Sequence, residues 1–297
     1  MSPLSADIIR HFAANLGFED CRFTSPVLGD ALSEYRDLVQ TDHIGDMAYL
    51  RRHFPLKENP ELLLPGVRSA VVVIKNYKNT AHQHLPQPRK IARYAVGQDY
   101  HLVMSQKLDA LAGHIRHLDP TVQTYCGVDS RPLAERSLAL KAGVGFRGRN
   151  TMVIKPKLGS YFFIGIVLTT AVFPEDKPMH FTCGTCRKCI DACPTDALSE
   201  DGRLDPLRCI SYQTIEQKAP MSGAQRKAAQ GWRFGCDICQ EVCPFNHSQT
   251  PLTDWELFMP EAGVGFDFFE QPEQPEIPKD TALYRSRKQI RENWKRI

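Results

Sequence analysis

The sequence lacks three features that would settle a function class at once: a long apolar run, an excess of charge and an N-terminal leader. The longest apolar run, Phe162 to Leu168, is far shorter than the roughly 20 residues that span a bilayer. The first residues contain neither the basic nor the apolar stretch of a signal peptide. Lys and Arg number 37 against 34 Asp and Glu, a net charge of +3, so any nucleic-acid surface must be local. We therefore expect a cytoplasmic protein that does not enter a membrane.

A glycine loop for nucleotides is also missing. Gly143, Gly145 and Gly148 match the spacing G-x-G-x-x-G, but they follow a predicted helix and precede a predicted strand. A dinucleotide-binding loop has the opposite order, strand and then helix. His82 and His84 alternate in a Pro-rich stretch over residues 80–89, which we interpret as a surface loop with solvated side chains rather than a metal site.

Cysteine, by contrast, is abundant and patterned, because eight of the ten cysteines fall in or between two bursts. The first burst spaces three cysteines two residues apart and sets a fourth before proline. Bacterial two-cluster ferredoxins have this run, and their fourth cysteine ligates the other cluster. Three such thiolates converge on one four-iron cubane, and the proline turns the chain away. One [4Fe–4S] cluster is thus assigned to Cys183, Cys186, Cys189 and Cys243, and the other to Cys193, Cys209, Cys236 and Cys239.

Two zinc sites of four cysteines each are the alternative interpretation. Zinc sites usually place their cysteines in two well-separated close pairs rather than in a run of three. A disulfide framework is typical of small secreted chains, and this chain has 297 residues. Cys21 and Cys126 lie outside the bursts and are expected to be ordinary reduced thiols.

The first 172 residues alternate amphipathic helices with apolar strands, which predicts an α/β domain. A helix is expected to follow Ser130, as N-cap, and Pro132, to run to about residue 142, and to end at Gly143 or Gly145. The fold class is thus α+β or α/β. Its parts are an α/β domain over 1–172, a ferredoxin-like two-cluster domain over 173–250, and a wrap with a basic helix over 251–297. Other helices are predicted over 5–16, 30–40, 45–53 and 100–118, and strands over 69–75, 121–126, 150–154 and 161–169.

Five segments together resemble the epoxyqueuosine reductase family, and the resemblance runs from about Met47 to the end of the sequence. They are ARYAVGQDYH (92–101), VDSRPLAER (128–136), AGVGFRGRNT (142–151), CISYQTIE (209–216) and GCDICQEVCP (235–244). Members are cobalamin-dependent [4Fe–4S] reductases, related in architecture to reductive dehalogenases. They reduce epoxyqueuosine at the tRNA wobble position to queuosine.

The resemblance implies separate roles for the N-terminal domain, the two clusters and Asp129. The N-terminal domain would bind cobalamin and substrate, and Co(I) cobalamin would receive its electrons through the two clusters. Asp129 would be the proton donor, with its pKa raised by burial beside the corrin. From the residues alone, an Asp before a helix is equally well interpreted as a cap. Asp99 and His101 begin a D-x-H-x-x-G cobalamin motif whose Gly is absent, so no histidine ligand to cobalt is expected.

The implied partners are tRNA carrying epoxyqueuosine and an electron donor of flavodoxin or ferredoxin type, and the protein is expected to be a monomer. The cobalamin contacts implied are Arg52, Tyr94, Asp129, Val153, Ser211 and Asp237. The tRNA candidates are Lys218 and, from the basic C-terminal helix, Arg285, Arg287, Lys288 and Arg291, although such a helix is more often a solvated face.

The sequence also departs from the family pattern. Arg131 stands where Gly is usual and could alter the pocket mouth; Phe146 and Phe245 replace Trp, and Arg149 replaces Lys. Many members carry a C-terminal helical-repeat domain that contributes to tRNA binding, and we expect that contribution to be absent here.

Two other functions are consistent with the cysteines. One is a small-molecule cobalamin reductase of the reductive-dehalogenase kind, against which the basic tail and the missing twin-Arg signal argue. The other is a non-catalytic carrier of electrons or cobalamin, which would need neither so large an α/β domain nor the Asp129 motif.

The spacing of the bursts predicts that anaerobically reconstituted protein carries about eight irons per chain, from two four-iron clusters. Iron and zinc analysis of the reconstituted protein measures this directly. Zinc in place of iron, or about four irons, would reject the two-cluster assignment.

Overall fold

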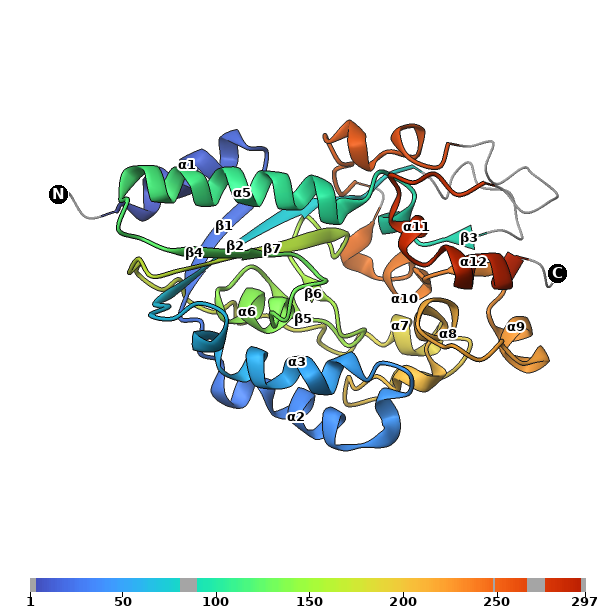
Figure 1. Ribbon diagram of the computed structural model, residues 1–297. Coiled ribbons are helices and arrows are strands. Elements are labelled where there is room, and N and C mark those ends of the chain that lie inside the picture. Colours follow the sequence, from blue (N-terminus) through green and yellow to red (C-terminus); the bar gives the residue numbers. More distant parts are fainter. Residues whose placement is uncertain (1–3, 81–89, 248, 266–275, 295–297) are drawn as a thin grey trace.

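The computed structural model describes residues 4–80, 90–247, 249–265 and 276–294, without the side chains of Arg287, Glu292 and Trp294. The predicted loop over 80–89, with His82 and His84, lies almost wholly outside this range. The N-terminus and the C-terminal helices lie at opposite ends of an elongated molecule (Figure 1). No helix in the described ranges has both the length and the apolar character needed to cross a membrane.

A four-stranded sheet organises the N-terminal half, with strands in the order β1-β2-β7-β4. Every neighbouring pair in it is antiparallel. Of the two predicted fold classes, α/β would have a mostly parallel sheet, so the antiparallel pairing supports α+β for this half and corrects the predicted α/β domain. The strands are β1 (Asp20–Thr24), β2 (Ser69–Asn76), β7 (Phe162–Thr169) and β4 (Thr124–Gly127).

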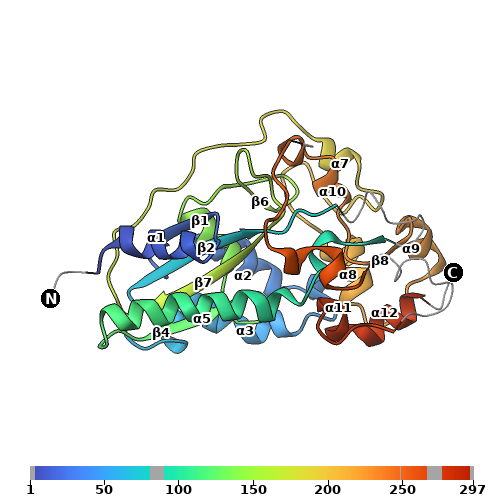
Figure 2. The ribbon, with the colours of Figure 1, turned by 90° about the horizontal axis from the view of Figure 1, so that it is seen from above.

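Helices cover both faces of this sheet. On one face lie α1 (Ala6–Asn15) and α5 (Tyr100–Leu118), side by side in Figures 1 and 2. On the other lie α2 (Ser33–Gln40), α3 (Tyr49–Glu58) and α6 (Glu135–Lys141). Successive residues of β2 therefore enter two different cores, and all eight residues are buried. This double cover, rather than a parallel direction, explains the unbroken apolar run of β2.

The turn after β4 differs from its prediction. Helix α6 begins at Glu135 with Ala134 as its N-cap, so Ser130 is not a cap and Pro132 is not helical. The reason is local, because Asp129 has a φ of 49° and Ser130 N–H closes a tight turn onto Val128 O at 2.6 Å. The predicted end at Gly143 is confirmed, since Gly143 directly follows the C-cap of α6. A Cβ at this position would lie 2.0 Å from a carbonyl oxygen, so a larger residue would not fit.

The cysteine-rich half is built from short elements. They are α7 (Lys188–Asp191), α8 (Ile210–Ile215), α9 (Gly223–Ala228), β8 (Trp232–Phe234) and α10 (Ile238–Glu241). Strand β8 pairs in parallel with β3 (Lys90–Ile91), which joins the two halves. A hairpin of β5 (Phe146–Arg147) and β6 (Val153–Ile154) lies between the sheet and the cysteines.

The C-terminal part returns across both halves. Residues 251–265 hold only two 3₁₀ turns, and their backbone bonds to Lys78 O and Gln98 N at 2.8 Å. Helices α11 (Ala282–Arg285) and α12 (Arg287–Trp294) follow. Asn293 of α12 donates from its amide to Thr214 O and Arg233 O at 2.9 and 3.0 Å. The domain boundaries near residues 172 and 250 stay predictions.

Replacing Ile166 by Ala should destabilise the fold, because Ile166 is fully buried in β7 between the sheet and the α6 layer. Truncating a buried Ile costs about 2–5 kcal/mol of unfolding free energy. Leu62→Ala, at a side chain that is 60% exposed, is the matched control. Thermal unfolding of the two reconstituted variants compares them, and equal shifts in their midpoints would contradict the assigned core.

Candidate active site

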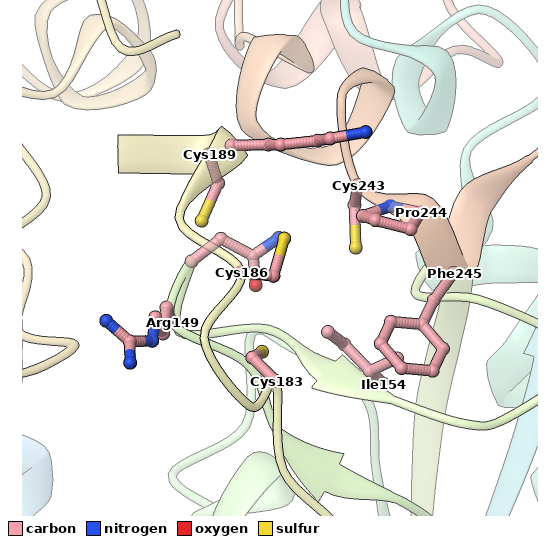
Figure 3. A pocket seen from close by; sticks show the side chains of 10 residues that line it. Arg149, Ile154, Cys183, Cys186, Cys189, Cys243, Pro244 and Phe245 are labelled. Atoms are coloured by element: carbon pink, nitrogen blue, oxygen red, sulfur yellow. The ribbon is translucent and has the colours of Figure 1, made fainter. Parts of the chain in front are cut away.

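One group of four predicted cluster ligands lines a single cavity. Figure 3 shows the thiols of Cys183, Cys186, Cys189 and Cys243 turned toward this common space. A tight turn, with Cys186 N–H on Cys183 O at 3.1 Å, leads the first burst into α7. Cys243 arrives from the far end of α10, where Pro244 begins a 3₁₀ turn. Two segments more than fifty residues apart in sequence thus supply one set of sulfur donors.

The other four cysteines form a second group. Burial, above all, raises the pKa of the Cys236 thiol, and the nearby Cys209 and Cys193 raise that pKa further. Cys239 is influenced in the same way by Cys236 and Cys209. In the described residues, no three His, Cys, Asp or Glu side chains lie close enough to hold a single metal ion. Two sets of four thiols, each spread around its own space, suit a cluster that offers one iron to each sulfur.

Asp129 stands where β4 ends and the chain turns toward α6. Its left-handed backbone, with φ of 49°, is uncommon for a residue other than glycine and is typical of functional turns. The backbone N–H of Asp129 donates to Glu135 Oε1, which fixes the turn from the helix that follows. The Asp129 side chain is 61% exposed, so its carboxylate faces outward from the sheet end.

A chain of charged groups stands behind Asp129. His101, in the first turn of α5, places Nε2 at 3.1 Å from Asp129 Oδ2 and Nδ1 at 2.6 Å from Asp99 Oδ1. Asp99 caps α5 through the His101 N–H at 3.0 Å. The other oxygen of Asp99 accepts a 2.6 Å hydrogen bond from Arg285 Nε of α11. Four side chains from three segments are thereby linked into one line.

The protein groups around Asp129 lower its pKa, and the raised pKa expected beside the corrin stays a prediction. Burial opposes ionisation, but the hydrogen bonds from His101 and Tyr100 outweigh it. Burial also opposes the positive charge of His101, yet its bonds to Asp129 and Asp99 raise the pKa of its ring. The same bonds, with that of Arg285, hold the pKa of Asp99 at about 2 in spite of burial. The surroundings therefore favour the ionised form of Asp129 and the protonated form of His101.

Carboxyl and phenol groups surround the same space. Tyr49 of α3 donates to Glu216 at 3.2 Å. Burial and the charge of Asp129 raise the pKa of Glu135 to about 8. Burial is also the main cause that raises the pKa of Tyr94, and the charges of Asp129 and Asp237 raise it further. After burial and Glu216, Asp129 also raises the pKa of Tyr49, so α3, α6 and the 90–95 segment all lie near Asp129.

The predicted cobalamin contacts lie in several elements. Asp237 is 1% exposed and accepts the Arg93 N–H at 2.8 Å, and Tyr94 packs in the same small cluster as Cys236. Val153 lies in the β5–β6 hairpin, and Ser211 is the second residue of α8, where its N–H faces the Cys209 sulfur. Arg52 is exposed on α3, one turn after Tyr49, and no described contact joins it to the others.

The predicted RNA contacts separate into two kinds. Lys218, Lys288 and Arg291 are exposed. Arg285 is exposed as well, with 47% of its side chain accessible, but it also forms a salt bridge with Asp99, whose side chain is only 6% exposed. The side chain of Arg287 lies outside the described residues.

Sequence reasoning missed the roles of His101, Asp99 and Glu135. A signal for the first two was present, because an Asp two residues before a His at a helix start can both cap the helix and bond the ring. Nothing in the sequence linked them to Arg285, which is 186 residues from Asp99.

Comparison with known proteins shows which family the chain belongs to. A family model described as epoxyqueuosine reductase QueG, DUF1730, matches residues 57–130, and one for a 4Fe-4S double cluster binding domain matches residues 182–246. The epoxyqueuosine reductase of Cyclobacterium marinum is 35% identical over 269 residues, covering 89% of this chain and 86% of the relative. The chain belongs to the epoxyqueuosine reductase family. The Salmonella typhimurium member is 34% identical and covers 86% of this chain and 67% of that relative.

Solved structures of the family agree. An epoxyqueuosine reductase with an epoxyqueuosine-modified tRNA-Tyr stem loop matches with 28% identity and a TM-score of 0.79, over 97% of this chain and 79% of that one. A Bacillus subtilis structure whose catalytic aspartate loop is swung out of the active site matches with the same values. A reductive dehalogenase, at 15% identity and a TM-score of 0.51 over 96% of this chain and 35% of the other, shares the fold alone.

Replacing Cys243 by Ala should remove the cluster of the first burst, because Cys243 lines the cavity of Cys183, Cys186 and Cys189. Iron content should fall from about eight to about four per chain. Cys126→Ala, outside both groups, is the control and should keep the full complement. Iron analysis with EPR of the reduced protein distinguishes the two sites, and loss of the second cluster instead would overturn the grouping.

Proposed function

We propose that this protein reduces epoxyqueuosine in tRNA to queuosine, with Asp129 as the group that delivers the proton. The observation that carries this is the hydrogen bond between His101 and Asp129, whose exposed carboxylate stands on a left-handed turn. Membership of the family supports the reaction. The cysteine groups support electron delivery to the site by two [4Fe–4S] clusters.

Cobalamin fits polar groups near its predicted contacts. Two buried polar atoms have no hydrogen-bond partner within the described ranges: Thr151 Oγ1, two residues from Val153, and Tyr161 Oη, whose ring lies 5.4 Å from the Arg93 guanidinium. Thr151 also has a φ of 65°, which is strained for a β-branched residue. Unsatisfied donors and stored strain of this kind are expected where an amide-rich ligand binds.

Cobalamin, when bound, supplies a cobalt centre that accepts one electron at a time and reacts at the epoxide carbon. The residues that would hold it are Tyr94 and Arg52 at its amides, the Val153 main chain, and Ser211 and Asp237 beside the second cluster. Asp129 then lies on the substrate side. Breaking a C–O bond leaves an oxygen that must be protonated, and Asp129 is the exposed acid of the site.

The charge distribution suits a tRNA substrate. Lys218, Lys288 and Arg291 are exposed cations, whereas Asp129 holds the negative charge of the site. Phosphates would bind at the cations and a base would enter beside Asp129. A one-electron donor of flavodoxin or ferredoxin type, a monomeric state and a cytoplasmic location complete the proposal.

The reaction is tested by mass spectrometry of nucleosides from epoxyqueuosine-containing tRNA, after anaerobic incubation with protein, cobalamin and a low-potential reductant. Formation of queuosine is the expected result. Unchanged epoxyqueuosine with a fully loaded protein would reject the proposed function.

Asp129→Asn should keep the clusters and the fold but lose about 10²–10⁴-fold in turnover, because an amide cannot deliver the proton. Asn tolerates the left-handed backbone as well as Asp does. Asp196→Asn is the matched control, since Asp196 also has a left-handed φ, 47°, and lies on the surface. Turnover by Asp129→Asn close to that of the control would remove Asp129 from the mechanism.

A further inference from the structure

The proton demand of the reaction exceeds what one carboxyl group holds. Removing an epoxide oxygen to leave an alkene breaks two C–O bonds and releases water, which takes two electrons and two protons. Asp129 carries at most one proton, and its pKa is lowered, so at neutral pH it carries none at rest. A second group must therefore load Asp129 during each turnover.

His101 is placed to do this. Its Nε2 lies 3.1 Å from Asp129 Oδ2, and its Nδ1 lies 2.6 Å from Asp99 Oδ1. An ionised carboxylate can only accept a hydrogen bond, so a ring between two of them carries a proton on both nitrogens. The ring is itself 9% exposed, whereas Asp129 is open. A nucleoside seated over Asp129 would shut that carboxylate off from water but leave its contact with His101.

The far side of the ring is fixed by the C-terminal segment. Asp99 is buried, caps α5 and bonds the ring through one oxygen, and its other oxygen takes the Arg285 Nε at 2.6 Å. Arg285 belongs to α11, which also buries Ala282 and Leu283 in the main core. A buried carboxylate with two fixed partners sets both the position and the protonated edge of an imidazole.

We propose that His101 is the proton relay that loads Asp129, and that Asp99 and Arg285 are positioning residues that hold the relay in place. This rests on the proposed epoxyqueuosine reduction. In each proton transfer the His101 Nε2–H bond breaks and an O–H bond forms on Asp129 Oδ2. That O–H bond then breaks as the departing oxygen of the substrate takes the proton. Two such proton transfers, with two electrons from a low-potential one-electron donor, give the alkene and one water. The His101 ring takes up a new proton from solvent between the two transfers.

Every charged group that faces His101 in the described residues enters this account. Asp99 lies on its own helix, Asp129 on the β4–α6 turn, and Arg285 on α11 beyond Asp99. Tyr100 hydrogen-bonds Asp129, and Glu135 and Arg136 lie next to Asp129. Two carboxylates against one cation favour the charged ring. Removing Arg285 removes the cation and should raise the pKa of His101 further.

The first measurement is direct: NMR titration of the ¹³C-labelled histidine rings in the cluster-loaded full chain. The wild-type His101 ring should titrate above the usual histidine range. Arg285→Gln should move its pKa upward, and Arg285→Lys, which keeps the charge, should restore most of the wild-type value. A His101 pKa unaffected by Arg285→Gln would overturn the positioning role, whatever the enzyme's activity.

The second measurement is steady-state kinetics on epoxyqueuosine tRNA across pH. His101→Gln should lower kcat by about 10²-fold or more with KM little changed. Arg285→Gln and Asp99→Asn should lower kcat about 10- to 100-fold, and Arg285→Gln should move the alkaline limb of the profile upward with the NMR pKa. Arg10→Gln is the matched control, because it breaks an Arg–Asp pair of 2.9 Å at the far end of the sheet. It should leave kcat, KM and the pH profile unchanged.

The outcomes separate the two proposals. If wild-type protein makes no queuosine, the proposed function fails while the NMR titration still tests the relay geometry. If wild type is active and His101→Gln keeps its kcat, the relay fails and the function stands. If Arg285→Gln raises KM alone, Arg285 is an RNA contact and not a positioning residue. Should His101→Gln lose its clusters, the Arg285 variants, which change a partly exposed side chain, decide the question.

Discussion

The two halves of this protein are held together where a short N-terminal strand runs alongside the cysteine-rich segment. Ile91 pairs in parallel with Phe234, and the next residues continue the contact, with Ala92 N–H on Phe234 O at 2.9 Å and Arg93 N–H on Asp237 at 2.8 Å. Gly235 makes this approach possible, because a Cβ there would lie 2.5 Å from that of Ala92. The position of Tyr94 next to Cys236, and hence of any cofactor between the halves, depends on this backbone contact.

The sequence predicted well what local pattern controls. Helix α5 has the predicted limits, Tyr100 and Leu118, because its apolar periodicity is long and Asp99 caps it. The convergence of Cys183, Cys186 and Cys189 on one cavity follows from their spacing, since short gaps leave few ways to place three sulfurs, and Cys243 follows from the ferredoxin pattern. The strand direction in the sheet could not be predicted in this way. A strand covered on both faces has the same apolar run whichever way its neighbours point.

The candidate site shows the same limit more sharply. The segment around Asp129 was found from sequence, but the lowering of its pKa by a histidine from another element was not. His101, Asp99 and Arg285 come from two helices that are distant in sequence, and only tertiary structure aligns them. Arg285 illustrates the ambiguity of a basic helix, since its neighbours Lys288 and Arg291 are exposed while it meets a buried carboxylate.

The bond between Arg285 and Asp99 also bears on how the protein is made. Asp99 leaves the ribosome well before Arg285 does, so a nascent chain holds a carboxylate that belongs in the interior without the cation that balances it. Burying such a charge without its partner is costly. The α5 end of the sheet should therefore stay open during synthesis, and close only when α11 arrives. Assembly of the clusters could take place in that interval, while the path between the two halves is still accessible to an iron–sulfur donor.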